Sequence, residues 1–368
     1  MNRSRLLLAS FVVISFVVAA TAFRATTVIP RAGVVSPAAP MLEPRSGHSA
    51  TLLPDGKVLI AGGMRRNQDF YKSAELYDPS TGKFQPTGEM NERRVGQIAV
   101  LLRSGKVLVA GGWVGHGGTD AAELYDPATG KFTAISKMTV GRGRPSATLL
   151  AGGDVLIAGG EEQDNESLGS AEVFREKTLS FQPTGSMHHA RVCHTATLLH
   201  DGRVLIAGGY ADSVSSSAEI YDPKTGSFRE TGSLQTARSK HTAGLLSDGR
   251  VLIAGGSANR GWNGNLNSAE TYDPKTGRFA PAFPLNDSRF KLPEEAVRLA
   301  DGRLLVAGGS KQVEVFDPGS GRFLVASGVM ADARHYMSET KLKDGSVLMT
   351  GGYPNNDQAT AQTWIYKP

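Results

Sequence analysis

Three glutamates are the residues of this sequence with the clearest potential for chemistry. Glu294 and Glu295 lie in one short segment and Glu339 lies in another, although the corresponding segments elsewhere in the chain are small and neutral. Carboxyl groups held close to cations can transfer protons or bind a polar ligand. Arg289 and Arg334 precede the two segments. We therefore treat the glutamates as weak catalytic candidates and the arginines as ligand-binding residues that favour an anion.

The same charges also have a structural interpretation. Arg298 and Lys341 lie in these two segments, so opposite charges alternate along them. Ion pairs between Arg298 and Glu339, and between Glu295 and Lys341, would satisfy the charges without a ligand. Water in a central channel would solvate them equally well.

A second group of candidates lies in or beside polar loops that follow paired glycines. Aromatic faces with Asn and Asp neighbours suit sugars or the hot spots of protein ligands. The sequence predicts ligand-binding roles for Trp113, Tyr210, Trp262 and Tyr353 of these loops, and also for His335, which follows Arg334.

Metal and thiol chemistry have weaker support. His188 and His189 with His194 could be read as a metal cluster, but no nearby carboxylate completes the set. Cys193 is the only cysteine, and no dedicated base accompanies it, so we expect a small buried residue. We predict no metal and no cofactor.

The elements that position these residues come from a sevenfold repeat. Paired glycines close an apolar run at intervals of 43 to 53 residues, beginning at Gly62, Gly111, Gly159, Gly208, Gly255, Gly308 and Gly351. The repeat at 191–234 shows four short apolar or alternating segments separated by turn sequences such as Asp201-Gly202. Four antiparallel strands repeated radially predict an all-β, seven-bladed β-propeller of four-stranded blades.

Two charged residues recur with the repeat. The arginines are Arg45, Arg94, Arg142, Arg191, Arg238, Arg289 and Arg334, and the glutamates are Glu75, Glu123, Glu172, Glu219, Glu270 and Glu314. A residue present in every blade serves something that every blade needs. We expect Arg–Glu pairs or backbone hydrogen bonds that hold each blade to its neighbour. A basic ring that attracts anions is the alternative.

The start Arg-x-x-His at Arg45, Arg191 and Arg238, the double glycine and the Tyr-Asp-Pro resemble kelch repeats, with Phe in place of the usual Trp on the fourth strand. The resemblance covers essentially the whole chain after the leader. It implies a propeller like the central domain of galactose oxidase, but it does not specify a function.

The chain ends indicate how the ring closes. The last repeat stops after its third strand, and residues 33–42 match the fourth-strand segment of other repeats. We predict that this N-terminal strand completes the last blade and removes an open sheet edge. The expected parts are a signal peptide at 1–22, a linker at 23–32 and the propeller at 33–368. The expected blades are 45–90, 94–138, 142–187, 191–234, 238–285, 289–330, and 334–367 with 33–42.

The leader predicts export. Arg3 and Arg5 precede the apolar run 6–20, and Ala20-Thr21-Ala22 resembles a cleavage site. We expect a periplasmic or secreted protein without a membrane span after cleavage, an uncleaved signal anchor being the alternative. The net charge of +5 includes no long basic run, so nucleic acid is not an expected partner. We expect a monomer.

Three functions follow from these features. The favoured one is a non-catalytic exported module that binds a glycan or a protein on the loop face, the face that carries the variable loops after the paired glycines. The alternative is a periplasmic small-sugar mutarotase or epimerase resembling the sialic acid enzyme of the kelch group, with Glu294, Glu295 and Glu339 as acid–base residues. A copper enzyme resembling galactose oxidase would need two histidines, two tyrosines and a cysteine. The sequence offers only Cys193 and the pair His335-Tyr336, so this function is disfavoured.

Overall fold

The structure is a computed structural model that describes residues 32–261, 263–354 and 358–368. The expected signal peptide and nearly all of the expected linker therefore lie outside the described residues. Within the described part of the chain, no helix is long and apolar enough to cross a membrane.

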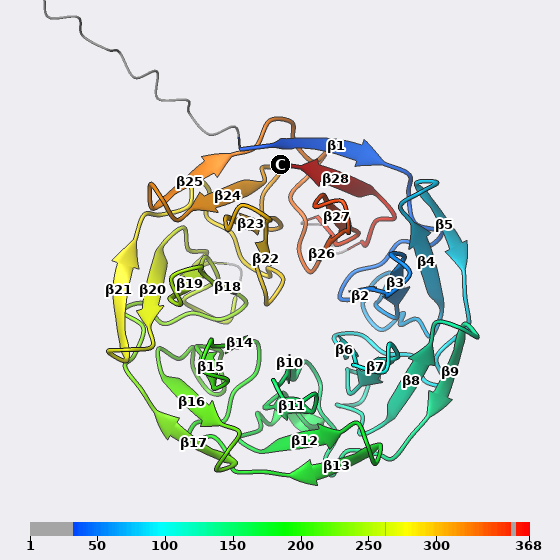
Figure 1. Cartoon of the computed structure of the whole chain (residues 1–368), viewed down its shortest axis with the longest axis horizontal. Coiled ribbons are helices and arrows are strands. Elements are labelled where there is room, and N and C mark those ends of the chain that lie inside the picture. The colour runs from blue at the N-terminus through cyan, green and yellow to red at the C-terminus, as the bar shows by residue number, and fades with distance from the viewer. Residues whose placement is uncertain (1–31, 262, 355–357) are drawn as a thin grey trace, which may run out of the picture. The chain divides into compact units, whose positions relative to one another are not determined.

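Seven four-stranded antiparallel sheets form a ring of blades (Figure 1). Blades 1 to 3 consist of β2 (Ser49–Leu52), β3 (Val58–Ala61), β4 (Ala74–Asp78) and β5 (Lys83–Pro86); β6 (Ile98–Leu101), β7 (Val107–Ala110), β8 (Ala122–Asp126) and β9 (Lys131–Ala134); and β10 (Ser146–Leu149), β11 (Val155–Ala158), β12 (Ala171–Arg175) and β13 (Ser180–Pro183). One short 3-10 helix, Gln163–Asn165, lies in the loop between β11 and β12.

The remaining blades have the same order, from the innermost strand to the outermost. Blades 4 to 6 consist of β14 (Thr195–Leu198), β15 (Val204–Ala207), β16 (Ala218–Asp222) and β17 (Ser227–Glu230); β18 (Thr242–Leu245), β19 (Val251–Ala254), β20 (Ala269–Asp273) and β21 (Arg278–Ala282); and β22 (Val297–Arg298), β23 (Leu304–Val306), β24 (Glu314–Asp317) and β25 (Arg322–Val325). Blade 7 consists of β26 (Ser338–Lys341), β27 (Val347–Thr350), β28 (Thr363–Lys367) and β1 (Val34–Ala38). The predicted propeller is confirmed.

The N-terminal strand closes the ring as predicted. Strand β1 lies along β28 beside the C-terminus (Figure 1), with Val35 opposite Tyr366 and Pro37 opposite Trp364. The Tyr366 hydroxyl donates to the carbonyl of Ala32 at 2.9 Å. Because β28 would otherwise expose its outer edge, this pairing leaves the seventh sheet with four strands like the others.

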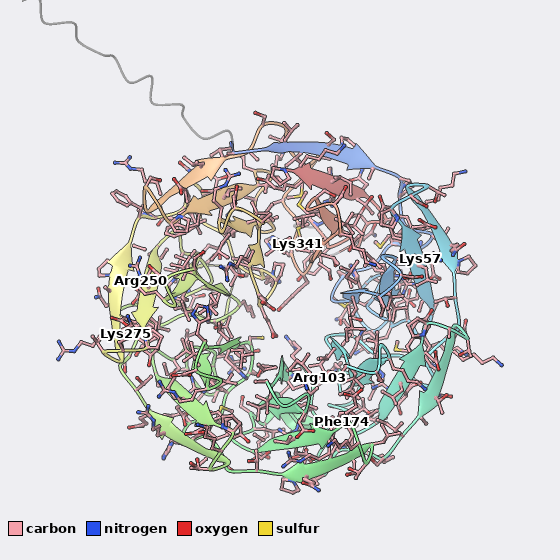
Figure 2. All side chains as sticks on the ribbon, viewed as in Figure 1. Lys57, Arg103, Phe174, Arg250, Lys275 and Lys341 are labelled. Carbon is pink, nitrogen blue, oxygen red and sulfur yellow. The ribbon has the colours of Figure 1, made fainter. Side chains whose placement is uncertain are left out.

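The apolar core lies between neighbouring blades. The second strand of each blade, for example β3 and β11, is fully buried. One cluster combines Leu108 of blade 2 with Val155 and Phe174 of blade 3, and Figure 2 shows Phe174 in the space between these blades. An aromatic pair joins the third and fourth strands, such as Tyr77 and Phe84 with ring centroids 4.9 Å apart. Phe therefore fills the position that Trp takes in similar repeats.

The repeated arginines are structural. Arg45, Arg94, Arg142, Arg191, Arg238 and Arg289 are at most 1% exposed and pair with the repeated glutamates at 2.5–3.0 Å. In blade 4, Glu219 also accepts the backbone N–H of His188, in the segment that enters from blade 3. Each Arg–Glu pair thus stabilises the segment that leads from one blade to the next, called the crossover below, as the structural interpretation predicts.

Candidate functional site

A ring of seven equivalent residues surrounds the channel on the loop face. Each lies two residues after a repeated arginine and has a φ between 50° and 63°. The members of this ring, called the mouth ring below, are Gly47, Gly96, Arg144, Cys193, Lys240, Lys291 and Tyr336. Five of the seven adjacent pairs are joined by a backbone hydrogen bond, as where Gly96 N–H donates to the carbonyl of Gly47 at 2.9 Å.

Five of the seven members carry a side chain in a conformation that favours glycine. For a residue with a Cβ, the left-handed region costs roughly 1–2 kcal/mol. Blades 1 and 2 show that glycine is compatible with the ring. Strain of this kind concentrates at functional sites, so the side chains of Arg144, Cys193, Lys240, Lys291 and Tyr336 point to a role beyond folding.

A cavity of about 490 Å³ opens at this ring. Its lining includes Arg144, Cys193, Lys240 and Tyr336 of the mouth ring, together with Glu294, Glu295 and Glu339. The opposite side of the lining, on blades 1 and 2, is mainly apolar and aromatic, with Phe70, Val95 and Trp113. The volume lies in the range of small-molecule sites.

The three cations of the mouth ring have different surroundings. The Arg144 guanidinium lies 2.7 Å from a carboxylate oxygen of Glu161. The Lys291 ammonium is buried and donates to the Tyr353 hydroxyl at 2.6 Å. Lys240 is only half-buried, and its ammonium lies 5.5 Å from the centre of the Tyr210 ring.

A fourth cation lies close to Lys240. The Arg260 guanidinium is 4.9 Å from the centre of the same Tyr210 ring. Burial is the main cause that lowers the pKa of Lys240; Arg144 and Arg260 also lower it, whereas Cys193 and Glu161 raise it. Among the described residues, no carboxylate lies within ion-pair distance of Lys240. Two cations over one ring, without a neutralising carboxylate on the lysine, form a site that an anion would stabilise.

The three glutamates lie in the cavity but do not form the expected ion pairs. In blade 6, twelve residues separate Arg289 from Asp301, against ten from Arg45 to Asp55 in blade 1. The extra residues run beside β18, where Ala243 N–H donates to the carbonyl of Glu294 at 3.0 Å. Only Val297–Arg298 forms the inner strand β22.

The two cations of the expected ion pairs bond to other oxygens. Arg298 donates to the Ser247 hydroxyl at 2.9 Å, and Lys341 donates to the carbonyl of Arg298 at 2.9 Å. Within the described ranges, neither cation is paired with Glu295 or Glu339, so the predicted self-satisfied network is wrong. Arg298 lies opposite Leu304 as the equivalent Lys341 lies opposite Val347, so both cations keep the register of the repeat but bond to other oxygens.

These carboxyl groups are therefore poorly stabilised as anions. Water reaches Glu294 and Glu295 within the channel, but the surrounding protein removes bulk solvation, which raises the pKa of Glu294 to about 8 and also raises that of Glu295. Burial raises the pKa of Glu339 to about 8, although Ala307 N–H donates to one of its oxygens at 2.9 Å. The other oxygen of Glu339 is buried without a hydrogen-bond partner. These shifts favour the protonated, neutral forms of Glu294 and Glu339 over the anions.

Arg289 and Arg334 do not face the mouth as expected. Arg289 is fully buried and bonds to Glu314. Arg334 is 3% exposed and donates to the Gln362 side-chain oxygen at 2.6 Å. Both occupy the crossover position of every other blade, so their guanidinium groups are engaged within the protein.

The other predicted site residues are divided between the cavity and the interior. Trp113 is half-buried and lines the cavity. Tyr210 is buried beside Cys193, and Tyr353 and His335 are buried with ring centroids 5.7 Å apart. Trp262 lies outside the described residues.

The histidines of the repeat and the cysteine are buried within the protein. His48, His194 and His241 are buried, and each bonds through Nε2 to a hydroxyl of the preceding blade at 2.8–3.0 Å. Burial lowers the pKa of His48 and of His194 to about 3. Cys193 is buried, which raises the pKa of its thiol.

Sequence reasoning missed Arg144, Lys240, Lys291 and Tyr336 as a group. The signal that could have found them is the second residue after the repeated arginine, directly before the histidine position, which is Gly, Gly, Arg, Cys, Lys, Lys and Tyr in successive blades. This residue type differs from blade to blade, although the residues around it repeat.

Comparisons with known proteins agree with this architecture. Residues 44–91, 97–139 and 191–235 match the family model of the Kelch motif. No curated protein matches the sequence significantly. One similar solved structure is described as a novel fungal alcohol oxidase of the AA5 family in complex with copper. The TM-score is 0.74 at 17% identity, over 92% of this chain and 77% of that chain. At this identity, the similarity shows a shared fold alone.

Proposed function

Because this chain is a kelch-repeat β-propeller, a fold that many functions share, we propose its function from the residues of the channel mouth. We propose an exported, non-catalytic binding protein whose ligand is an acidic glycan or sugar acid on the loop face. The observation that carries the proposal is Lys240, a mouth-ring cation beside Arg260 and Tyr210 with no carboxylate partner among the described residues.

The rest of the cavity supports an anionic, hydroxyl-bearing ligand. Protonated Glu294 and Glu339 can donate hydrogen bonds to hydroxyl or carboxylate oxygens. Because their raised pKa values favour the neutral forms, these two carboxyl groups oppose the charge of Lys240 less than ordinary carboxylates would. Trp113 and Phe70 offer aromatic faces on the opposite side of the cavity.

The test compares galacturonate with its neutral parent, galactose, by isothermal titration calorimetry. We expect galacturonate to bind and galactose to bind at least tenfold more weakly. Lys240→Met should weaken galacturonate binding by about 1.5–3 kcal/mol, the usual contribution of a hydrogen bond to a charged group, which is roughly tenfold to a hundredfold in Kd. Equal binding of both sugars, or no effect of Lys240→Met, would contradict the proposal.

A second candidate is a sugar mutarotase or epimerase, favoured by the glutamates with raised pKa. A carboxyl group that titrates near neutral pH is suited to general acid–base catalysis. Mutarotation followed by polarimetry would reveal this activity. It should fall in Glu294→Gln and Glu339→Gln and follow a pKa near 8.

Copper chemistry does not fit this mouth. The electrostatic neighbours of Cys193 are the cations Arg144 and Lys240 and the carboxyl groups of Glu161 and Glu294, and His241 uses Nε2 to bond Thr195. The described residues contain no group of three or more His, Cys, Asp or Glu side chains that could hold a metal. Copper(II) favours sets of nitrogen and oxygen donors, and the described residues do not assemble such a set at the mouth.

The remaining parts of the proposal concern location and partners. We propose that the leader directs the chain to the periplasm or outside the cell, and that the mature protein acts as a monomer without nucleic acid. A protein ligand on the loop face is the alternative occupant. Cell fractionation and light scattering of the secreted protein test these points.

A further inference from the structure

Four cations lie around the channel on the face opposite the loop face. This face, called the turn face below, carries the short turns between the first and second strands, such as Asp201-Gly202. The four cations lie at the end of an inner strand or two residues after it, and we call them the basic rim: Arg103, Arg298, Lys341 and Lys343. Lys341 is half-buried and the other three are exposed. Figure 2 shows Arg103 and Lys341 near the centre of the ring, on opposite sides.

Two of the rim positions carry leucine in the rest of the propeller. Arg298 lies opposite Leu304 and Lys341 lies opposite Val347. The residues at the same register in blades 1 to 5 are Leu52, Leu101, Leu149, Leu198 and Leu245. The blades therefore fold with leucine at this position, so the packing of the propeller does not explain the two cations.

Each rim cation donates to a neutral oxygen of a neighbouring blade. The acceptors are the Ser247 hydroxyl for Arg298, at 2.9 Å, and the carbonyls of Arg298, Pro54 and Ala151 for Lys341, Lys343 and Arg103. These bonds place the cations at the boundaries between blades 5 and 6, 6 and 7, 7 and 1, and 2 and 3. Three of the four boundaries are consecutive, so the positive charge forms an arc beside the channel.

The carboxylates of the same turns are engaged with other cations. Asp201, Asp248 and Asp301 each pair with the arginine two residues later at 2.6–2.7 Å. Glu176 accepts the backbone N–H of Ser104. Over residues 32–261, 263–354 and 358–368, no carboxylate lies within ion-pair distance of a rim cation. The charge of the rim is therefore not neutralised by the protein, and it attracts anions.

We propose that the basic rim binds an anion that carries two or more phosphate groups. A guanidinium donates two parallel hydrogen bonds to phosphate oxygens, and an ammonium adds a point charge. Cations at consecutive blade boundaries favour an anion with several charges over a monovalent one. A soluble oligophosphate and a lipid headgroup with two phosphates share this chemistry. The site lies on the face opposite Lys240, so the inference does not rest on the proposed function.

The test is isothermal titration calorimetry of the mature protein with tripolyphosphate. We expect binding that weakens as salt is added, because exposed charges are screened. Arg298→Leu and Lys341→Leu introduce the residue that five blades already carry, so the melting temperature should not fall. Each should weaken binding about tenfold, the loss expected for a hydrogen bond to a charged group.

The matched control is Lys275→Ala, which removes the same charge from the same face. Lys275 is exposed in the turn between β20 and β21, and Figure 2 shows it at the outer edge of the ring. Its binding of tripolyphosphate should equal that of wild type. Co-sedimentation with phosphatidylcholine vesicles that contain cardiolipin distinguishes the two sources. Pelleting that Arg298→Leu abolishes assigns a headgroup, whereas binding of tripolyphosphate alone assigns a soluble ligand.

Several results would overturn the inference. Wild-type protein that binds neither probe has no such site, and equal losses in Lys275→Ala and Arg298→Leu would indicate attraction to the whole face. Loss of tripolyphosphate binding in Lys240→Met, with Arg298→Leu unaffected, would place the anion on the loop face. Binding of hexaglutamate in place of tripolyphosphate would reject phosphate in favour of an acidic peptide. Galacturonate binding should not change in the rim variants, so the proposed function is tested separately.

Discussion

Replacing Arg191 with methionine tests the structural role of the repeated arginines. Arg191 is fully buried and donates to the carbonyls of Gly208 and Ser217 at 2.7 and 3.1 Å, to the Ser217 hydroxyl at 2.9 Å and to Glu219 at 2.9 Å. Methionine fills the space of the stem but leaves these acceptors without their donor. Breaking a buried ion pair by removing one partner costs about 3–5 kcal/mol.

The lower end of this range is expected for Arg191→Met. Glu219 keeps the backbone N–H donors of His188 and His189 at 2.8 and 3.2 Å, which continue to stabilise its charge. We therefore expect a loss of about 3 kcal/mol in the free energy of unfolding, measured as a shift in the urea midpoint at constant slope. The double variant Arg191→Met/Glu219→Leu should regain only part of it, because those two N–H groups then lose their acceptor.

The control is an exposed pair on the same propeller. Lys72 and Glu89 lie 2.7 Å apart with exposed side-chain fractions of 57% and 54%. Lys72→Met should cost no more than about 1 kcal/mol. Equal losses in Lys72→Met and Arg191→Met would refute the reasoning, since the buried pair would then contribute no more than a surface pair.

Three further predictions concern pH, the mouth ring and closure. Glu339 binds its proton more tightly in the folded protein, so wild-type stability should fall as pH rises from about 4.5 to about 8; Glu339→Gln should remove this loss and melt higher than wild type at pH 9, but not at pH 4.5. In Gly96→Ala the new Cβ would lie 2.7 Å from Arg144 Cγ, whereas Gly82→Ala at a similar φ meets nothing within 4 Å; calorimetry should therefore show weaker galacturonate binding in the first variant only. Deleting residues 33–42 should expose β28 and cause aggregation in size-exclusion chromatography, and a monomer with unchanged melting temperature would contradict the closure.

The sequence was sufficient to predict the fold because the same physical pattern occurs seven times. Four short strands, Asp-Gly turns and a buried second strand in each repeat are together typical of blades arranged radially in a β-propeller. The closing strand was predictable because the last repeat lacks a fourth strand. The Arg–Glu pairs followed from the same logic, and that logic also applies to Arg289, which the sequence analysis nevertheless placed at the mouth.

The site was less predictable because it depends on backbone conformation and on hydrogen-bond partners. No propensity indicates that a lysine or an arginine adopts a positive φ, since this region is costly for both. The ring imposes it, because each member must donate to or accept from its neighbour across the blade boundary. The expected Arg298–Glu339 pair is absent because Arg298 donates to Ser247 and Glu339 accepts from Ala307 N–H, and the sequence alone does not show these partners.

In each blade, the buried arginine and the mouth-ring residue two positions later have separate roles, which explains how the mouth ring can hold residues with a strained backbone. The arginine of each crossover is buried and bonded to at least one carbonyl or side-chain oxygen of its own blade, so the position of the backbone two residues later is set by the interior. The residue at that position can then vary without changing the ring. Blades 1 and 2 use glycine, which leaves room for Val95 over Gly47 and for Arg144 over Gly96, while blades 3 to 7 present side chains. The stabilising and variable positions are therefore separated by two residues in every repeat, and the chemistry of the mouth can change while the propeller remains the same.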